Sequence, residues 1–296
     1  MRDKVIARLK GGLGNQLFCY AAARRLALVN GAELVIDDVT GFVRDHKYKR
    51  NYALDHFNIT ARKATPRERL EPFERYRRGL AKMVARRRPF HQRRYVEQDG
   101  IDFDRRLLEF KVEGTVYLDG LWQSEEYFRD VADIIRKDLA IIHPKDERNK
   151  ESAKRIQRGN AVAVHVRWFE SPNLQSTTHN LDKKYYMRAV NEITGKVREP
   201  HFFLFSDNPD VARRMLDLPK DAVTALSQNR GDEKAYADLG LMSQCKHFVI
   251  ANSTFSWWGA WLGEKTNSII ISPGEMRGEI TAWGFEGLIP NRWNRL

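Results

Sequence analysis

Residues 5–37 read VIARLKGGLGNQLFCYAAARRLALVNGAELVID and predict a β-α-β unit. The apolar run at 5–9 is typical of a buried strand, and glycines follow it at positions 11, 12 and 14. Apolar side chains then recur at helical spacing over about 15–30, and Gly31 is suited to end that helix. The second apolar run, at 33–37, predicts a strand parallel to the first.

The same alternation of strands and helices continues along the chain. A strand is expected at 116–118 and a helix at 124–139, before a charged stretch at 144–158 separates two halves. In the second half we expect strands at 161–166, 201–205, 222–226, 247–250 and 268–271. The pattern predicts an α/β protein with two Rossmann-like domains, residues 1–150 and 151–296, that face a cleft at the carboxyl ends of their strands.

Composition excludes several classes of protein. The chain has 296 residues, of which 42% are hydrophobic, so it can bury enough apolar surface to avoid intrinsic disorder. Two cysteines cannot build a disulfide framework or a structural zinc site. No secretory signal or membrane-spanning segment is apparent. We therefore expect a cytoplasmic protein, either free or peripheral on the inner face of a membrane.

Most of the net charge of +12 comes from one segment, residues 67–94. This basic segment holds eleven Lys and Arg residues against three Glu residues, which gives +8. Its apolar side chains recur at helical spacing, so an amphipathic basic helix that ends near Pro89 is expected. Two interpretations stay open: a solvated face, or contact with an anionic membrane surface.

The turn between the first strand and its helix is the first candidate site. Glycine lets the backbone approach a ligand closely, and the free amides at a helix start favour an anion. Gly12 and Gly14 are therefore candidates for contact with a nucleotide donor, and the side-chain amides of Asn15 and Gln16 suit recognition of hydroxyl groups. A tight turn without a ligand is the alternative.

A strand that ends in His165 and Arg167 is the second candidate site. The carboxyl edge of a parallel sheet presents such side chains, and a guanidinium can hold a diphosphate through two hydrogen bonds. In the alternative interpretation, Arg167 pairs with a nearby carboxylate and His165 is a hydrogen-bonded core residue.

Residues 252–261, NSTFSWWGAW, follow an expected strand and form the third candidate site. Asn252, Ser253 and Thr254 lie where a helix begins, and they can donate hydrogen bonds to a phosphate. The three tryptophans suit either the hydrophobic core or a wall that stacks on a sugar.

No metal site is expected. None of the eight histidines forms a His-x-x-x-His pair, and Asp102-Phe103-Asp104 lacks the apolar strand that precedes a metal-binding Asp-x-Asp motif. Cys19 falls in an apolar helix and is expected in the core rather than as a nucleophile.

Four motifs together resemble the α-1,2-fucosyltransferases of glycosyltransferase family 11, within the superfamily that includes the protein O-fucosyltransferases. They are GGLGNQLF at 11–18, DGLWQSEEYF at 119–128, FSDNP at 205–209 and NSTFSWWG at 252–259. They occur in the family's order along the chain, and the set is far more specific than any single motif.

The resemblance implies a GT-B-like fold in which residues 151–296 hold GDP-L-fucose and residues 1–150 face the acceptor. It implies inverting transfer of fucose to the 2-hydroxyl group of a galactose, with no obligatory metal or other cofactor. It suggests that Arg167 contacts the diphosphate and that Asn15 lies at the reacting centre. The other donor contacts that it suggests are His165, Asp207, Asp238, Asn252, Ser253, Thr254 and Phe255, with Asp238 at the place of an aspartate that reads guanine.

One motif departs from the family's pattern. Where the family usually has His-x-Arg-Arg-Gly-Asp, residues 165–170 read HVRWFE. One positive charge is lost at Trp168, and the carboxylate of Glu170 is one methylene longer than that of aspartate. Trp168 and Glu170, together with Gln16, are expected on the acceptor side, and no residue is assigned as the catalytic base.

The expected partners are GDP-fucose and a galactose-terminated oligosaccharide, with a lipid-linked acceptor left open. Two other functions also stay open. One is a glycosyltransferase that uses another nucleotide sugar or linkage, and the other is a basic nucleic-acid-binding protein that uses residues 67–94. No pattern of a nucleic-acid-binding module is present, so nucleic acid is not an expected partner.

Overall fold

The computed structural model describes residues 2–168, 180–277 and 282–296, and it divides into two compact units. Unit 1 comprises Met1–Ala140 and Glu286–Leu288, and unit 2 comprises Ile141–Phe285 and Ile289–Leu296. The boundary expected at residue 150 lies inside helix α4 (Glu147–Gln157). The side chain of Asp146 caps this helix by accepting a 3.0 Å hydrogen bond from the N–H of Asn149. The charged stretch is therefore a helix of unit 2 and not a linker.

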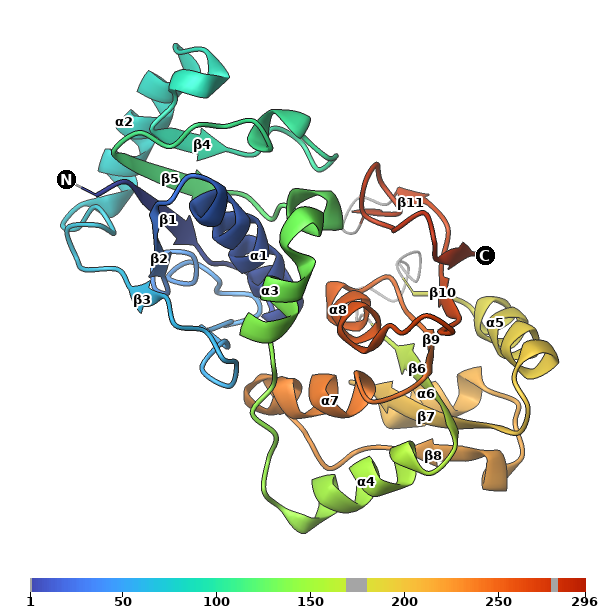
Figure 1. Cartoon of the computed structure of the whole chain (residues 1–296). Coiled ribbons are helices and arrows are strands. Elements are labelled where there is room, and N and C mark those ends of the chain that lie inside the picture. The colour runs from blue at the N-terminus through green and yellow to red at the C-terminus, as the bar shows by residue number, and fades with distance from the viewer. Residues whose placement is uncertain (1, 169–179, 278–281) are drawn as a thin grey trace. The chain divides into compact units, whose positions relative to one another are not determined.

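Unit 1 is built on a parallel sheet with the strand order β3-β2-β1-β5-β4 (Figure 1). The predicted β-α-β opening is confirmed, and Gly31 follows its helix with a positive φ of 61°. The strands are β1 (Lys4–Arg8), β2 (Glu33–Asp37), β3 (Arg62–Lys63), β4 (Tyr95–Glu97) and β5 (Thr115–Asp119). The α-helices are α1 (Leu13–Val29), α2 (Glu74–Arg86) and α3 (Ala132–Asp138).

The helix expected at 124–139 is interrupted. Two short 3-10 turns, Glu125–Tyr127 and Arg129–Val131, precede α3. Phe128, between them, has a non-helical φ of −142° and is fully buried, with its ring 6.4 Å from that of Phe18. Burial of this aromatic side chain overrides the helical periodicity of the segment.

Unit 2 is built on a parallel sheet with the strand order β13-β10-β9-β6-β7-β8. Its strands are β6 (Asn160–Val166), β7 (Pro200–Ser206), β8 (Val223–Ala225), β9 (His247–Val249), β10 (Ile270–Ser272) and β13 (Asn294–Arg295). Its remaining α-helices are α5 (Lys183–Lys196), α6 (Pro209–Met215), α7 (Ala235–Met242) and α8 (Thr254–Gly263). A hairpin of β11 (Met276–Arg277) and β12 (Ala282–Trp283) follows β10. The five strands expected here are confirmed.

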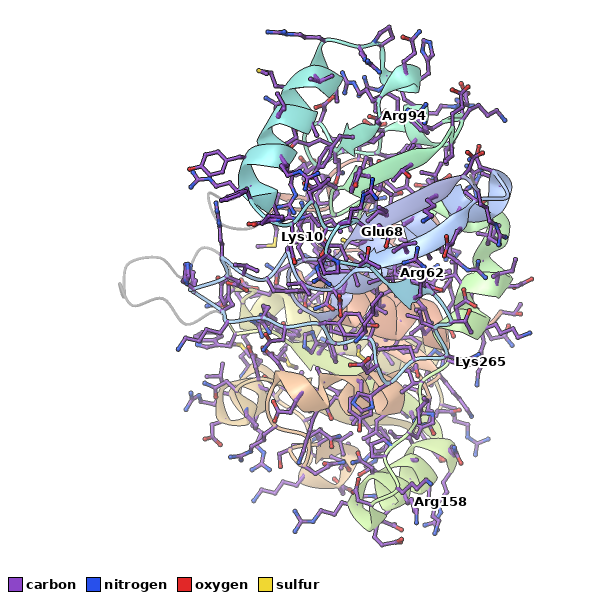
Figure 2. All side chains as sticks on the ribbon, turned by 90° about the vertical axis from the view of Figure 1, so that its left-hand side faces the viewer. Lys10, Arg62, Glu68, Arg94, Arg158 and Lys265 are labelled. Atoms are coloured by element: carbon purple, nitrogen blue, oxygen red, sulfur yellow. The ribbon has the colours of Figure 1, made fainter. Side chains whose placement is uncertain are left out.

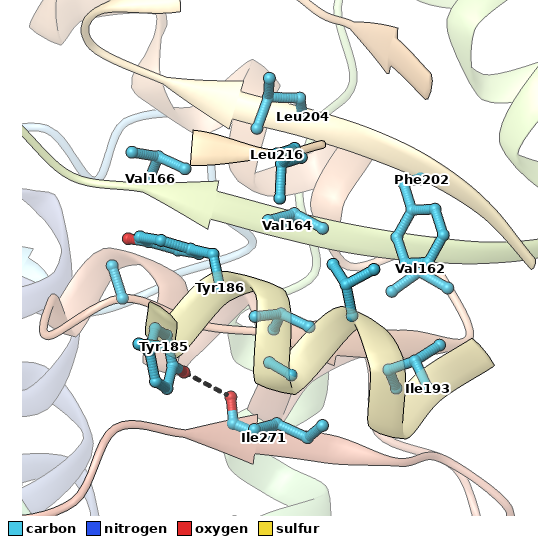
Figure 3. Packing of buried hydrophobic residues seen from close by; sticks show 14 of the residues in the cluster. Val162, Val164, Val166, Tyr185, Tyr186, Ile193, Phe202, Leu204, Leu216 and Ile271 are labelled. Atoms are coloured by element: carbon cyan, nitrogen blue, oxygen red, sulfur yellow. Dashed lines mark hydrogen bonds between the residues drawn. The ribbon is translucent and has the colours of Figure 1, made fainter. Parts of the chain in front are cut away.

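The core of unit 2 packs α5 against the sheet (Figure 3). Tyr186 and Ile193 of α5 face the valines of β6, and all of these side chains are buried. The hydroxyl of Tyr185 donates to the carbonyls of Ile250 at 2.6 Å and Ile271 at 3.3 Å. These hydrogen bonds allow Tyr185 to lie in the core without an unsatisfied hydroxyl group.

Each sheet has one point at which the winding of the chain reverses. In unit 1 the chain passes from β1 to β2 and β3, and β5 then pairs with the other side of β1. In unit 2 it passes from β6 to β7 and β8, and β9 then pairs with the other side of β6. Doubly wound sheets bind ligands at the carboxyl ends of strands at such points. The four strands at these points are β1, β5, β6 and β9. All the candidate motifs except FSDNP begin at or just after the carboxyl ends of these strands, and FSDNP lies at the end of β7.

Candidate functional site

The guanidinium of Arg167 is fixed at the carboxyl end of β6. Its Nη1 atom lies 2.5 Å from Oδ2 of Asp207, which follows β7. The other carboxylate oxygen of Asp207 accepts a 3.0 Å hydrogen bond from the N–H of Trp168. The carboxylate pairing considered for Arg167 is therefore present. Because 27% of the Arg167 side chain stays exposed, the pair orients a cation that a ligand can still reach.

The FSDNP motif builds the support for this arginine. The hydroxyl of Ser206 donates to the carbonyl of Val166 at 2.7 Å and accepts from the N–H of Asn208 at 3.0 Å. The side chain of Asn208 in turn caps α6. Both oxygens of Asp207 make contacts within unit 2, and these contacts orient Arg167. Because 33% of its side chain is exposed, the expected contact of Asp207 with the donor stays a prediction.

His165 is a buried and neutral residue beside Arg167. Its burial, and next the positive charge of Arg167, lower the pKa of the imidazole to about 3. The Nδ1 atom has no hydrogen-bond partner in the part of the chain that the structure describes. Its ring centroid lies 5.3 Å from that of Phe255. A neutral imidazole with an open ring nitrogen can bind a ligand without repelling Arg167.

Helix α8 begins at this same edge of the sheet. Ser253 is its N-cap residue, yet the Ser253 side chain makes no capping hydrogen bond, and the first turn contains no acidic residue. The N–H groups of a first helical turn lack acceptors within the helix, and they carry partial positive charge. The start of α8 is therefore suited to an anion, as expected for Ser253, Thr254 and the buried Asn252.

The tryptophans of α8 belong to the core. Trp257, Trp258 and Trp261 are at most 1% exposed and contact one another, with ring centroids 5.0–6.2 Å apart. The interpretation in which they stack on a sugar is wrong, because no ligand can reach their faces.

Asp238, in α7, belongs to a polar cluster that includes the loop after β8. Its Oδ1 atom accepts a 2.8 Å hydrogen bond from Asn229, which exchanges bonds of 2.8 and 2.9 Å with Asn149 of α4. Burial raises the pKa of Asp238 to about 6, against the opposing effect of the Asn229 hydrogen bond. Sequence reasoning missed Asn149 and Asn229, because residues 80 positions apart give no local signal.

In unit 1, Asn15 is held between two motifs. Its Oδ1 atom accepts a 2.8 Å hydrogen bond from Gln123, in the loop after β5. Gly11 has a φ of 74°, and a Cβ there would lie 2.6 Å from Nδ2 of Asn15. Gly12, the N-cap of α1, lies beside the guanidinium of Arg50. Gln123 belongs to the motif at 119–128 but has no signal of its own in the sequence, and Arg50 has none either.

Gln16 has a structural role that conflicts with the expected acceptor contact. Its side chain is 1% exposed, and its Nε2 atom donates to the carbonyls of Gly11 and Asn51, each at 2.9 Å. Its Oε1 atom accepts from the N–H of Ala53, also at 2.9 Å. The amide is therefore used to hold the segment around 51–53 against the start of α1, where Gly14 is also buried.

A buried carboxylate, Asp119, gathers basic side chains at the ends of β1 and β5. It lies 2.9 Å from Nζ of Lys10 and 3.2 Å from Nη1 of Arg8, and it accepts a 2.7 Å hydrogen bond from the Tyr95 hydroxyl. Burial favours a raised pKa, but the charges of Lys10 and Arg8 outweigh it and hold the pKa of Asp119 far below its usual range. Asp119 thus fixes two cations near the glycine-rich turn.

The two aspartates of the Asp102-Phe103-Asp104 segment are engaged in local contacts. Asp102 accepts from the N–H of Glu286, and Asp104 pairs with Arg106 at 2.6 Å. Residues 2–168, 180–277 and 282–296 contain no group of three or more His, Cys, Asp or Glu side chains that could hold a metal ion. Nor, within these ranges, is any helix long and apolar enough to cross a bilayer. Glu170 lies outside the described residues.

A sequence model of the family described as Glycosyl transferase family 11 matches residues 4–282. The chain belongs to this family. The resemblance carried by the four motifs is thereby confirmed. Sequence relatives include an α-1,2-colitosyltransferase of Escherichia coli, 27% identical, with 91% of each chain covered. Another is the O-antigen biosynthesis glycosyltransferase WbnK of Escherichia coli, 28% identical, with 90% of this chain and 92% of the relative covered.

Solved structures support the GT-B-like fold of this family 11 member. NodZ α-1,6-fucosyltransferase from Bradyrhizobium, soaked with GDP-fucose, aligns with a TM-score of 0.52 at 18% identity, covering 88% of this chain and 93% of NodZ. A variant of FUT1 from Arabidopsis thaliana, in complex with GDP, aligns with a TM-score of 0.53 at 13% identity, covering 98% of this chain and 75% of FUT1. The protein is a fucosyltransferase-like glycosyltransferase with two α/β units, each of which is built on a parallel sheet.

Proposed function

We propose that this family 11 glycosyltransferase transfers L-fucose from GDP-L-fucose to the 2-hydroxyl group of a galactose in a glycan, with inversion. One observation carries the donor part of the proposal: Arg167, His165 and the start of α8 meet at the carboxyl ends of β6 and β9. The neighbours crystallised with GDP-fucose and GDP support a guanosine nucleotide. The relative named α-1,2-colitosyltransferase supports the 1,2 linkage.

The chemistry requires stabilisation of a leaving group. When the bond from the sugar to the diphosphate breaks, negative charge grows on the phosphate oxygens. A guanidinium fixed in advance, together with helix-start amides, stabilises that charge most in the transition state. Arg167 and the start of α8 supply these groups, so we propose that transfer needs no metal ion. The ion pair with Asp207 keeps the guanidinium oriented before the donor binds.

We propose that Asp238 binds the guanine base. A guanine edge presents two adjacent N–H donors, and a carboxylate can accept both. Asn229 already bonds to one carboxylate oxygen of Asp238 and fixes the orientation of the group. Binding of a positive or donor-rich partner also offsets the cost of keeping a buried carboxylate ionised.

On the acceptor side, we propose that Asn15 orients the reacting hydroxyl group. Its amide can donate and accept hydrogen bonds, and the contact with Gln123 holds it in one orientation. An amide is too weak a base to remove a proton, so the contribution of Asn15 is to align the acceptor.

Colitose is the second candidate for the sugar that is transferred, because one relative is named a colitosyltransferase. Colitose is fucose without the 3-hydroxyl group. A site that hydrogen-bonds this hydroxyl group would discriminate strongly against colitose, and a site that does not would accept both sugars. The ratio of kcat/KM for the two GDP-sugars therefore separates the candidates.

The experiment incubates purified protein with GDP-fucose and a panel of β-galactosides, with and without EDTA, and measures GDP release. We expect release with at least one acceptor and an unchanged rate in EDTA. Thermal shifts with GDP, UDP and dTDP test the nucleotide separately, and GDP alone should stabilise the protein. Absence of GDP release with every acceptor, together with equal shifts for the three nucleotides, would overturn the proposal.

A further inference from the structure

Helix α2 (Glu74–Arg86) carries its apolar side chains on its outer face. Phe73, Tyr76, Leu80, Met83 and Val84 are 71%, 75%, 58%, 47% and 42% exposed. Tyr76, Leu80 and Met83, and likewise Leu80 and Val84, are three or four residues apart and so share one side of the helix. Phe73 precedes them at the N-cap position, and the five residues are here called the apolar stripe. The only buried residue of the helix is Ala85.

The opposite face of α2 attaches to unit 1 through charge. Nζ of Lys82 donates a hydrogen bond to Oε1 of Glu97 and lies 3.2 Å from Oδ2 of Asp119. Arg86 lies 2.9 Å from the other oxygen of Glu97. A surface helix normally turns its apolar face towards the core. Helix α2 does the reverse, so its amphipathic pattern serves something outside unit 1.

Arginines border the apolar stripe. The geometry of a helix places Arg77 along one edge and Arg86, which also reaches Glu97, along the other, while Arg75 lies two turns before Lys82. Arg75, Arg87 and Arg88 are exposed, and they form no ion pair with any residue of the described ranges. These charges are available to an anionic partner.

A hollow lies beside the apolar stripe, and its lining combines apolar and cationic side chains. It is lined by Gly79, Lys82, Met83, Arg86 and Arg87. Three of these residues are cationic, and Met83 belongs to the apolar stripe. A phosphate group joined to an apolar chain matches such a lining, whereas a soluble anion would leave the stripe in water.

We propose that α2 lies in the interface of an anionic lipid bilayer, with the apolar stripe among the acyl chains and the exposed Arg75, Arg87 and Arg88 on lipid phosphates. An interfacial helix needs these two contributions together. A second copy of the chain is a poor occupant, because the basic segment would face another segment of charge +8. The bilayer supplies both the apolar layer and the opposite charge.

Flotation of the full-length protein with vesicles tests the proposal. The vesicles contain phosphatidylcholine alone or phosphatidylcholine with about 30% phosphatidylglycerol, a composition that gives a negative surface potential. We expect the protein to float with the anionic vesicles only. Tyr76→Ser, Leu80→Ser and Met83→Ser combined should lower partitioning at least about tenfold. Arg75→Gln, Arg87→Gln and Arg88→Gln combined should lower it about 100-fold, since each basic residue near the surface contributes about fivefold.

Matched controls come from unit 2. Ile142→Ser removes an exposed apolar side chain, and Arg158→Gln with Lys265→Gln removes exposed charge (Figure 2). None of these should change partitioning by more than about twofold. All the altered side chains are exposed, so thermal melting should confirm that every variant is folded.

A fluorescent probe reports the stripe directly. Cys19 and Cys245 are buried, so Leu80→Cys can be labelled selectively with a polarity-sensitive dye, and Ile142→Cys serves as the control. We expect an emission shift to the blue for the dye at position 80 on anionic vesicles alone. Flotation that the α2 variants leave unchanged would overturn the proposal. So would a blue shift at position 80 that appears without vesicles as protein concentration rises, because a second copy would then cover the stripe.

Discussion

A guanidinium stabilises a leaving diphosphate best when it is held in place before the charge develops. Arg167 is held in this way, by Asp207 on one side and by the end of β6 on the other. His165 stays neutral beside it and so adds no competing charge. The second arginine of the family's pattern is replaced by Trp168, which leaves Arg167 as the cation of this motif.

Arg167→Ala should lower kcat for fucose transfer at least about 100-fold, which corresponds to about 3 kcal/mol of transition-state stabilisation. Steady-state kinetics with GDP-fucose measures the change. Arg158→Ala removes an exposed arginine of unit 2 and should keep kcat within about twofold (Figure 2). Activity retained by the Arg167 variant would remove this residue from the donor site.

The pH dependence of GDP binding should follow Asp238. The pKa of this carboxyl group is raised to about 6. In the proposed function, guanine N–H groups bind its ionised form. GDP affinity should therefore be full above pH 6 and should fall as pH decreases below it, by up to about tenfold per pH unit. Titration calorimetry between pH 5 and pH 8 measures the profile.

Two features help to assign the pH dependence of GDP binding to Asp238. His165 has a pKa of about 3 and so does not titrate in this range. Asp238→Asn should bind GDP more weakly, and it should keep only the pH dependence that comes from the terminal phosphate of GDP, whose second pKa is about 6. A variant that keeps the wild-type profile would show that another group binds the base.

At the scale of elements, the turn from β1 to α1 offers a matched pair of variants. Gly11→Ala strains a positive φ and forces a Cβ within 2.6 Å of Nδ2 of Asn15. Gly31→Ala strains a similar φ of 61°, but no atom lies within 4 Å of its Cβ. Both should lose about 1 kcal/mol of folding free energy. Only Gly11→Ala should also lower kcat, at least about tenfold, because it displaces Asn15.

Thermal melting, kinetics and GDP calorimetry separate the contributions. GDP affinity should be unchanged in both glycine variants, since the donor contacts proposed here lie in unit 2. Equal loss of activity in the two variants would mean that backbone strain alone is responsible and that Asn15 has no role in alignment.

The sequence determines the elements more clearly than the directions of their side chains. The β-α-β opening could be predicted because an apolar run, glycines and Gly31 all act locally. The periodicity of α2 likewise predicted an amphipathic helix, but not that its apolar face points outward, because that depends on Lys82 and Glu97. Gln16 is a similar case: its amide pattern was visible, while its burial depends on the segment around 51–53.

The candidate site was predictable to the extent that its residues follow strands at the reversal points of the sheets. His165, Arg167 and 252–255 satisfy this rule, and the structure brings His165 and Phe255 together. The cluster of Asn149, Asn229 and Asp238 does not follow it, because three separate segments meet there through tertiary packing.

At the scale of the whole molecule, the proposed nucleotide site lies in unit 2. Hydrogen exchange should show that GDP protects amides at the end of β6, in the loop after β8 and at the start of α8, with little change in unit 1. UDP at the same concentration is the control and should protect these amides less. Protection confined to unit 1 would reverse the assignment of the two units.

Transfer to a galactose 2-hydroxyl group is tested most directly by comparing two acceptors, a β-galactoside and its 2-deoxy analogue, in an assay of GDP release from GDP-fucose. We expect turnover with the galactoside, an α-1,2-linked product by NMR, and no turnover above background with the 2-deoxy analogue. Equal turnover of the two acceptors, or a product linked at another hydroxyl group, would contradict this proposal.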